Sequence, residues 1–286
     1  MEQQIDHLYS EFRRGASNRR DFLRRLTVFA GGTAAALALL PELEANYLKA
    51  SPPEDETGLF TESLTYSGQT GPIKAFLARP EKKKKYPAVV VIHENRGLQP
   101  HIKDVTRRMA KEGFLALAPD ALSPLGGTPE NDADKARDMI GQLNAEDTVK
   151  NLTAAVKFLE THPQSNGNVG CTGFCWGGAM TNQVAVNTPS LKAAVPYYGR
   201  TPAVEDVTKI KAPVMAHYAG DDPGINAGIG SFEEALKKAG IPYKIYIYDG
   251  AKHAFNNDSN PERYNAQAAA LAWTRTVTFF KDKLGE

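Results

Sequence analysis

Short apolar runs alternate with amphipathic segments over most of the 286-residue chain. The run Ala88-Val89-Val90-Val91-Ile92 is too continuous for a strand with one wet face, so it predicts a strand covered on both sides. Turn and capping signals divide the rest into strands at 60–66, 73–78, 86–93, 114–118, 169–174, 193–198, 213–219 and 243–248, and helices at 101–112, 147–161, 179–186, 230–239 and 261–283. The first two strands read as an antiparallel edge. The alternation as a whole predicts an α/β fold, a doubly wound, mostly parallel sheet with helices on both faces.

The first fifty residues have a different pattern. Arg19 and Arg20 precede Phe22, and residues 26–40 carry no charge. A membrane-spanning helix needs about 20 apolar residues. This shorter segment, rich in Gly, Ala and Thr, instead resembles a twin-arginine export signal. The pattern predicts a leader over residues 1–50 and a separate domain over residues 58–286.

Two features depart from such a signal. Asn18 stands where Ser or Thr is usual, and the nearest approach to a small-residue cleavage site is Leu48-Lys49-Ala50. We expect export to the periplasm, with the twin-arginine translocase as a partner. The alternative is a cytoplasmic protein whose helical N-terminal extension packs on the domain.

Composition removes several classes of function. A formal net charge of +1, without a basic stripe, gives no electrostatic case for nucleic acid. The run Lys82–Lys85 is interpreted as a solvated turn, with a docking patch as the alternative. We expect neither a metal nor an organic cofactor, because no phosphate-cradling Gly-rich loop and no close His/Cys cluster occurs in the sequence. Monomer and dimer both remain open.

Cys171 and Cys175 are the only cysteines. Four residues of extended chain separate their Cα atoms by about 13 Å, whereas a disulfide needs less than about 7 Å. Both are therefore predicted to be free thiols.

The strongest chemical signal is the stretch Gly173-Phe174-Cys175-Trp176-Gly177-Gly178. It joins a predicted strand to a predicted helix through a sharp turn. Such a turn strains its central residue and leaves no room for neighbouring side chains, which accounts for the glycines. The thiol of Cys175 is then presented at a sheet edge beside backbone N–H groups, where a thiolate or an oxyanion is favoured. The alternative is that Cys175 is only a small buried apolar residue.

A nucleophile of this kind needs a base and an orienting acid. Asp222 and His253 follow the last two predicted strands, so the chain order is nucleophile, acid, base, as in the α/β-hydrolase fold. Asp221 is the alternative acid, and otherwise a turn or helix-capping residue. A surface-loop role is the alternative for His253.

The loop after strand 86–93 supplies the remaining groups. The backbone N–H of Asn95 is predicted to complete an oxyanion hole with that of Trp176, and Glu94 places a carboxylate at the mouth of the site. His93 and His217 lie in or beside buried strands, which indicates structural roles. The other histidines, His7, His101 and His162, have no evident partner.

These motifs, together with Tyr197-Tyr198-Gly199 and His253-Ala254-Phe255, resemble the dienelactone hydrolase family from about Phe60 to Leu284. The resemblance implies a cysteine that attacks a lactone carbonyl through an acyl-enzyme, a histidine and an aspartate that complete the triad, and a glutamate at Glu94 that interacts with the resting thiol.

One departure concerns the substrate. Family members of the chlorocatechol pathway carry an arginine shortly after the histidine, where this chain has Asn256-Asn257. A carboxylate would need another cation. Arg200 is our first choice for binding a substrate carboxylate. The alternative interpretation of Arg200 is a solvated arginine in a loop, and Arg96 and Arg137 are further candidates for the binding role. Tyr198 is a predicted substrate contact.

The sequence therefore predicts a cysteine-dependent hydrolase of lactones or small carboxylic esters. A thioesterase, a peptide hydrolase or a xenobiotic esterase is the alternative within catalysis. A ligand-binding or thiol-redox protein without catalysis is the alternative from another class.

Overall fold

The computed structural model describes residues 5, 8, 9, 19–32, 35, 36, 39, 58–130 and 132–285. Contacts divide the chain into two compact units, Met1–Asp55 and Glu56–Glu286. In the first unit, helix α2 (Arg19–Ala30) buries Phe22 and Leu26 in a small apolar cluster. Residues 48–50, the nearest approach to a small-residue cleavage site, lie outside the described residues, as do the side chains of Arg19 and Arg20. None of the described helices has both the length and the hydropathy that a membrane span requires.

The second unit is built on one eight-stranded sheet with the order β1-β2-β4-β3-β5-β6-β7-β8. Its strands are β1 (Leu59–Gly68), β2 (Gly71–Pro80), β3 (Tyr86–Ile92), β4 (Leu115–Pro119), β5 (Ser165–Phe174), β6 (Ala193–Tyr197), β7 (Val214–Asp221) and β8 (Tyr243–Lys252). Strand β2 pairs antiparallel with β1 and with β4, and every other pairing is parallel. The predicted antiparallel edge and the mostly parallel sheet are confirmed.

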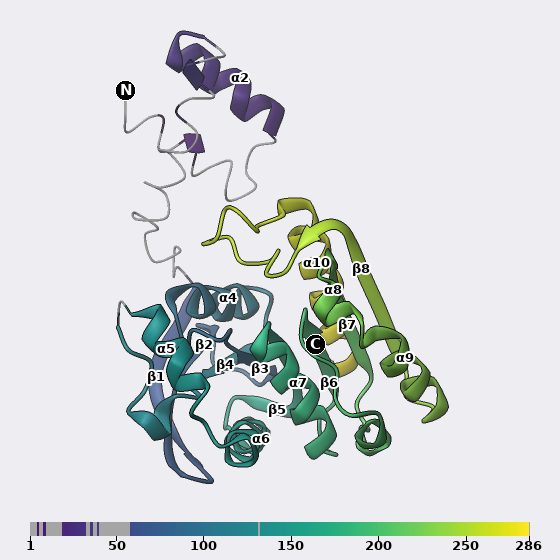
Figure 1. The fold of residues 1–286 in the computed structure, drawn as a ribbon. Coiled ribbons are helices and arrows are strands. Elements are labelled where there is room, and N and C mark those ends of the chain that lie inside the picture. The colour runs from purple at the N-terminus through teal and green to yellow at the C-terminus, as the bar shows by residue number, and fades with distance from the viewer. Residues whose placement is uncertain are drawn as a thin grey trace. The chain divides into compact units, whose positions relative to one another are not determined.

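Helices cover both faces of this sheet (Figure 1). They are α4 (Pro100–Lys111), α5 (Ala133–Ile140), α6 (Ala145–Thr161), α7 (Trp176–Asn187), α8 (Pro223–Asn226), α9 (Ile229–Lys238) and α10 (Ala266–Leu284), with 3-10 turns at Ser123–Leu125 and Val204–Lys209. Apolar side chains of α4 and α10 pack in one core layer, and those of α6, α7 and α9 pack in the other. Because layers cover both faces, all seven residues of β3 are buried, as its apolar run predicts.

Three predicted boundaries are wrong near the site. Strand β7 continues to Asp221 and β8 to Lys252, because an irregularity after Ala219 lets pairing resume between these two residues. The closing helix begins at Ala266 instead of 261. Its start is set by Asn265, whose side chain accepts a hydrogen bond from the Ala268 N–H at 3.1 Å. The chain between His253 and α10 is consequently a longer loop than predicted.

Candidate active site

Cys175 sits at the sharp turn between β5 and α7, as predicted. Its backbone has φ 56° and ψ −115°, in the half of conformational space that residues with a side chain rarely adopt. A Cβ at Gly173 would lie 2.3 Å from the Gly177 carbonyl oxygen, and one at Gly177 would lie 2.4 Å from the His93 carbonyl oxygen. The glycines are therefore required because backbone segments approach one another closely at this turn.

A second close approach joins α7 to the end of β6. A Cβ at Gly178 would lie 2.3 Å from the Tyr197 carbonyl oxygen, and one at Gly199 would lie 2.2 Å from the Gly178 carbonyl carbon. The Asn182 side chain also donates a hydrogen bond to the Arg200 carbonyl at 2.9 Å. The first turns of α7 are thus held against β6, which accounts for the glycine that follows Tyr197-Tyr198.

The environment of the thiol keeps it protonated near neutral pH. Burial is the largest effect, the charge of Glu94 adds to it and Asp222 contributes further, so that the pKa of Cys175 is raised to about 11. The backbone N–H groups of Trp176 and Asn95 donate to the sulfur and oppose this rise. The two N–H groups named for the oxyanion hole thus converge on one atom, and their role in catalysis stays a prediction.

Asp222 and His253 meet at the ends of β7 and β8. His253 Nδ1 lies 2.5 Å from Asp222 Oδ2, and both side chains are largely shielded from solvent. Asp221 is the exposed last residue of β7, so the expectation of a turn or capping role for it is wrong. Asp222 itself takes the position before α8, although its side chain makes no capping bond. Of the two aspartates, Asp222 has the geometry that orients a histidine.

The ring of Tyr198 packs against the ring of His253. Tyr198 has φ 35° and no exposed surface, and its ring centroid lies 5.1 Å from that of His253 and 5.3 Å from that of Phe255. Burial, followed by the charges of Glu94 and Cys175, raises the pKa of Tyr198 well above its ordinary value. The structure thus gives Tyr198 a contact with His253, while contact with a substrate stays a prediction.

His93 joins the loops around the thiol. Its Nδ1 donates to the Glu94 carbonyl at 2.6 Å, and its Nε2 accepts from the Ala121 N–H at 3.1 Å. Its ring stacks on Trp176 with centroids 5.4 Å apart and planes 16° apart. Burial lowers its pKa. The structural role predicted for His93 is confirmed.

His217 is the other buried histidine. Its ring nitrogens contact the Tyr248 hydroxyl at 2.8 Å and Thr276 Oγ1 at 3.0 Å. Burial, with a smaller contribution from Arg275, lowers the pKa of His217 to about 3, so the ring is neutral over the physiological range. Its predicted structural role is also confirmed.

Thr128 forms hydrogen bonds that hold the loop after β3, which carries Glu94 and Asn95. Its hydroxyl accepts a hydrogen bond from the Leu98 N–H at 2.8 Å and donates to Asp120 at 2.8 Å. A Cβ at Gly97, where φ is +77°, would lie 2.3 Å from that hydroxyl oxygen. Thr128 belongs to a loop in which the sequence shows no motif, so its role was not predicted.

The carboxylate of Glu94 is only partly satisfied. Oε2 accepts a hydrogen bond from the Asn257 side chain at 2.7 Å. Oε1 is buried and has no hydrogen-bond partner within the described part of the chain. Asn257, in the region where the related pathway enzymes carry an arginine, thus contacts the carboxylate beside the thiol.

The three candidate arginines fall into two groups. Arg96 and Arg137 converge on Asp134, at 3.9 Å and 3.7 Å, and their side chains are about half exposed at 54% and 52%. Arg200 is exposed beyond the end of β6. The structure therefore brings Arg96 and Arg137 together on one aspartate, and all three arginines stay candidates.

His101 has a partner that the sequence does not reveal. Its Nδ1 lies 3.1 Å from Asp258, which also binds Arg108 at 2.5 Å. The histidine and the aspartate are 157 positions apart, so no local pattern connects them. Of the remaining histidines, His162 accepts a hydrogen bond from the Gln164 N–H, and His7 lies outside the described residues.

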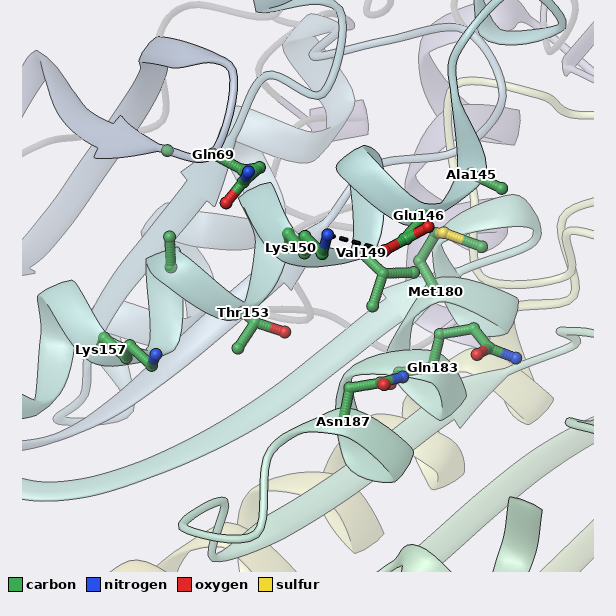
Figure 2. A pocket seen from close by; sticks show the side chains of 12 residues that line it. Gln69, Ala145, Glu146, Val149, Lys150, Thr153, Lys157, Met180, Gln183 and Asn187 are labelled. Carbon is green, nitrogen blue, oxygen red and sulfur yellow. Dashed lines mark hydrogen bonds and ion pairs between the residues drawn. The ribbon is translucent and has the colours of Figure 1, made fainter.

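A groove of about 840 Å³ lies between α6 and α7, away from these groups (Figure 2). Lys150, Lys157, Met180 and Gln183 are among the residues that line it, and Lys150 is paired with Glu146 at 2.7 Å. None of the predicted site residues is in its lining. Among the described residues there is also no cluster of three His, Cys, Asp or Glu side chains that could hold a metal ion.

A mostly parallel sheet, a cysteine at a sharp strand-to-helix turn and an Asp–His pair at the ends of two later strands define an α/β-hydrolase fold. The chain belongs to the dienelactone hydrolase family, whose model matches residues 73–284. The predicted class, a carboxylic ester hydrolase, is confirmed by this membership.

Relatives and solved structures agree with the assignment. A protein of Methylorubrum extorquens is 33% identical over 91% of this chain and 93% of its own length, and one of Saccharolobus solfataricus is 32% identical over 77% and 98%. Both are named provisionally as carboxymethylenebutenolidases. A Klebsiella pneumoniae structure titled provisionally as a dienelactone hydrolase has a TM-score of 0.69 and 28% identity, and it covers 78% of this chain and 98% of its own. A dienelactone hydrolase-like promiscuous phosphotriesterase from metagenomic libraries has a TM-score of 0.71 and 25% identity, covering 80% and 100%.

Proposed function

We propose that this protein hydrolyses lactones or small carboxylic esters through a thioester on Cys175. The observation that carries the proposal is the meeting of two features. One is a protonated thiol whose sulfur receives two backbone N–H groups, and the other is an Asp222–His253 pair at 2.5 Å, whose aspartate is close enough to the thiol to raise its pKa. The first can stabilise an oxyanion, and the second can move the proton that the thiol must lose.

The mechanism begins with proton transfer. Because the pKa of Cys175 is about 11, few molecules hold a thiolate at neutral pH, and attack on a carbonyl needs a base. Asp222 occupies Nδ1 of His253, which leaves Nε2 as the nitrogen that takes the thiol proton. The sulfur then bonds to the carbonyl carbon, and negative charge moves onto the carbonyl oxygen.

Collapse of this intermediate breaks the carbon–oxygen bond of the ester or lactone. The N–H groups of Trp176 and Asn95 stabilise the oxyanion, and the leaving oxygen takes the proton from His253. Water then attacks the thioester with His253 as base, which releases the carboxylic acid and returns the proton to the sulfur. A lactone gives one ring-opened hydroxy acid, whereas an ester gives an acid and an alcohol.

Glu94 holds the resting thiol in its protonated form. Its charge raises the pKa of Cys175, second only to burial. A neutral thiol is less exposed to oxidation than a thiolate, which suits a free cysteine outside the reducing cytosol. The role proposed for Glu94 is thus control of the thiol rather than attack on the substrate.

The test is a substrate screen with wild-type protein and Cys175→Ala in parallel. The panel contains p-nitrophenyl acetate, neutral and acidic lactones, and thioesters, so that it separates the alternative acyl hydrolases. We expect turnover of at least one lactone or ester by the wild type, loss of turnover with iodoacetamide, protection by substrate, and no turnover by Cys175→Ala. Equal activity of the two proteins, or turnover of no substrate in the panel, contradicts the proposal.

We also propose that residues 1–50 direct export through the twin-arginine translocase. The support is the Arg19-Arg20 pair at the start of α2, ahead of an uncharged segment. The charge-conserving change of Arg19→Lys together with Arg20→Lys tests it, because the translocase reads the arginines as an address. The double variant is expected in the cytosolic fraction, and a wild-type protein found wholly in that fraction contradicts export.

A further inference from the structure

A polar cluster joins the start of α4 to the loop after the candidate base. Asp258 lies five residues after His253, and its two carboxylate oxygens bind different partners. Oδ1 lies 3.1 Å from His101 Nδ1, and Oδ2 lies 2.5 Å from an Arg108 nitrogen. The side chains of His101 and Asp258 are only 4% and 19% exposed. We call this cluster, His101, Arg108 and Asp258, the latch.

The two partners of Asp258 favour its charged form. Burial alone would raise the pKa of Asp258, but the hydrogen bond from His101 and the charge of Arg108 hold it well below the ordinary value. Asp258 therefore stays ionised and accepts charge-assisted hydrogen bonds. A neutral amide in its place would keep one acceptor oxygen and lose the charge.

The residue next to the latch reaches the thiol environment. Asn257 Oδ1 accepts hydrogen bonds from the Ser259 N–H at 3.0 Å and the Ser259 hydroxyl at 2.5 Å. With its oxygen held in this way, the Asn257 amide directs Nδ2 toward Glu94, where it donates at 2.7 Å. Glu94 in turn acts on the pKa of Cys175.

The order of the strands separates the two loops that the latch and Asn257 connect. Glu94 follows β3 and His253 follows β8, and three strands of the sheet lie between β3 and β8. Backbone pairing therefore does not connect these two strand ends directly. Helix α4 begins eight residues after β3 ends, at Pro100, and carries two members of the latch. The latch thus ties the loop after β8 to the helix that follows β3.

We propose that Asp258 is a positioning residue of the active site, which holds the segment 253–260 against α4 so that Asn257 fixes Glu94 beside the thiol and His253 stays aligned with Asp222. The inference rests on the function proposed above. It predicts that weakening the latch changes the chemistry of Cys175 as well as the rate of catalysis, although no member of the latch touches the reacting atoms.

The test compares Asp258→Asn with Asp249→Asn, an exposed aspartate on β8, as the matched control. We measure kcat and KM for p-nitrophenyl acetate and the rate of iodoacetamide alkylation of Cys175 against pH. In Asp258→Asn, kcat is expected to fall by about tenfold or more while KM changes by less than about threefold, because misplaced catalytic groups slow the chemical step. The midpoint of alkylation is expected to move to lower pH, because Glu94 is no longer held beside the sulfur. Asp249→Asn should match the wild type in both.

A second variant keeps the test decisive if Asp258→Asn does not fold. His101→Phe keeps an aromatic ring of similar size and removes the hydrogen bond to Asp258. It also removes the buried Nε2 of His101, which has no partner among the described residues, so the hydrogen bond to Asp258 Oδ1 is the one His101 contact of this kind that is lost. It should shift kcat and the alkylation midpoint in the same directions by a smaller factor.

Unchanged kcat and an unchanged alkylation midpoint in a folded variant overturn the proposal, even if its melting temperature falls. An upward shift of the midpoint also overturns it. If the wild type hydrolyses no ester, the proposed function fails, and the latch is then judged on the alkylation profile alone. The two failures are therefore distinguishable.

Discussion

The turn that carries Cys175 and the loop that carries His253 are held in opposite ways. The turn is fixed by backbone atoms, since glycines at positions 173, 177 and 178 let three backbone segments approach one another too closely for any side chain. The histidine loop is fixed by side chains from distant parts of the chain, among them Glu94, His101 and Arg108. The position of Cys175 is therefore set by closely packed backbone, whereas the position of His253 depends on separate side-chain contacts that substitution can loosen one by one.

The largest expected effect is at His253, the proposed base. His253→Ala should lower kcat by about a hundredfold or more, because general base catalysis typically contributes that much. Loss of His253 and Cys175 together should cost little more than loss of either, since both belong to one proton-transfer unit. Steady-state kinetics on protein shown to be folded by circular dichroism check both statements. A His253→Ala variant that keeps more than about a tenth of the wild-type kcat removes His253 from the role of base.

Substitution of a glycine in the Cys175 turn is expected to lower the stability of the protein. Gly177→Ala places a methyl group against the carbonyl oxygens of Ile92 and His93, at 2.5 Å and 2.4 Å, and backbone atoms cannot rotate away. We expect a loss of about 1–3 kcal/mol in the free energy of unfolding. The control is Gly230→Ala in α9, where the added Cβ meets no atom within 4 Å, and it should be neutral or slightly stabilising. Equal stabilities of the two variants in urea titrations would mean that the turn is not closely packed.

The Cys175 turn and the His253 loop also differ in how much of their structure can be predicted from the sequence. The turn could be predicted because the residues that form it are six consecutive positions, although the backbone segments that its glycines approach, at the ends of β3 and β6, lie elsewhere in the chain. The strands and most helices follow from local patterns, Asp222 follows from its place after a predicted strand, and the family resemblance gives Glu94 its role. The latch, the hydrogen bond from Asn257 to Glu94 and the contact of Thr128 with Leu98 join positions far apart in the chain, where no spacing rule applies. The end of β8 was misplaced because a bulge restores pairing that the residue pattern does not display.

Glu94→Gln tests how the loop after β3 acts on the pKa of the Cys175 thiol. The charge of Glu94 raises the pKa of Cys175, so its removal lowers that pKa from about 11 and increases the thiolate fraction at every pH below it. We expect alkylation by iodoacetamide at pH 8 to be faster by about tenfold, which is one pKa unit. Glu234→Gln on the exposed side of α9 is the control. Slower alkylation of Glu94→Gln would mean that the carboxylate acts as a base toward the thiol.

The smallest effect concerns the substrate. Arg200→Ala is expected to raise KM for an acidic lactone by about tenfold, or about 1.4 kcal/mol, and to leave a neutral ester unaffected. Arg96→Ala and Arg137→Ala serve as comparisons, since these two arginines share Asp134. Equal effects of Arg200→Ala on both substrates indicate a structural role. If Arg200→Ala affects neither substrate, carboxylate binding is assigned to Arg96 or Arg137, or the natural substrate is neutral.

The central claim is that the Cys175 sulfur carries the acyl group during turnover. The most direct measurement is mass spectrometry of peptides from wild-type protein quenched in acid during the reaction with p-nitrophenyl acetate, with Cys175→Ala treated in the same way. The account predicts one added acetyl group on the peptide that contains Cys175, and none on the corresponding peptide of Cys175→Ala. Turnover with no acetyl group on Cys175, or with the acetyl group on another residue of a kinetically competent intermediate, would contradict it.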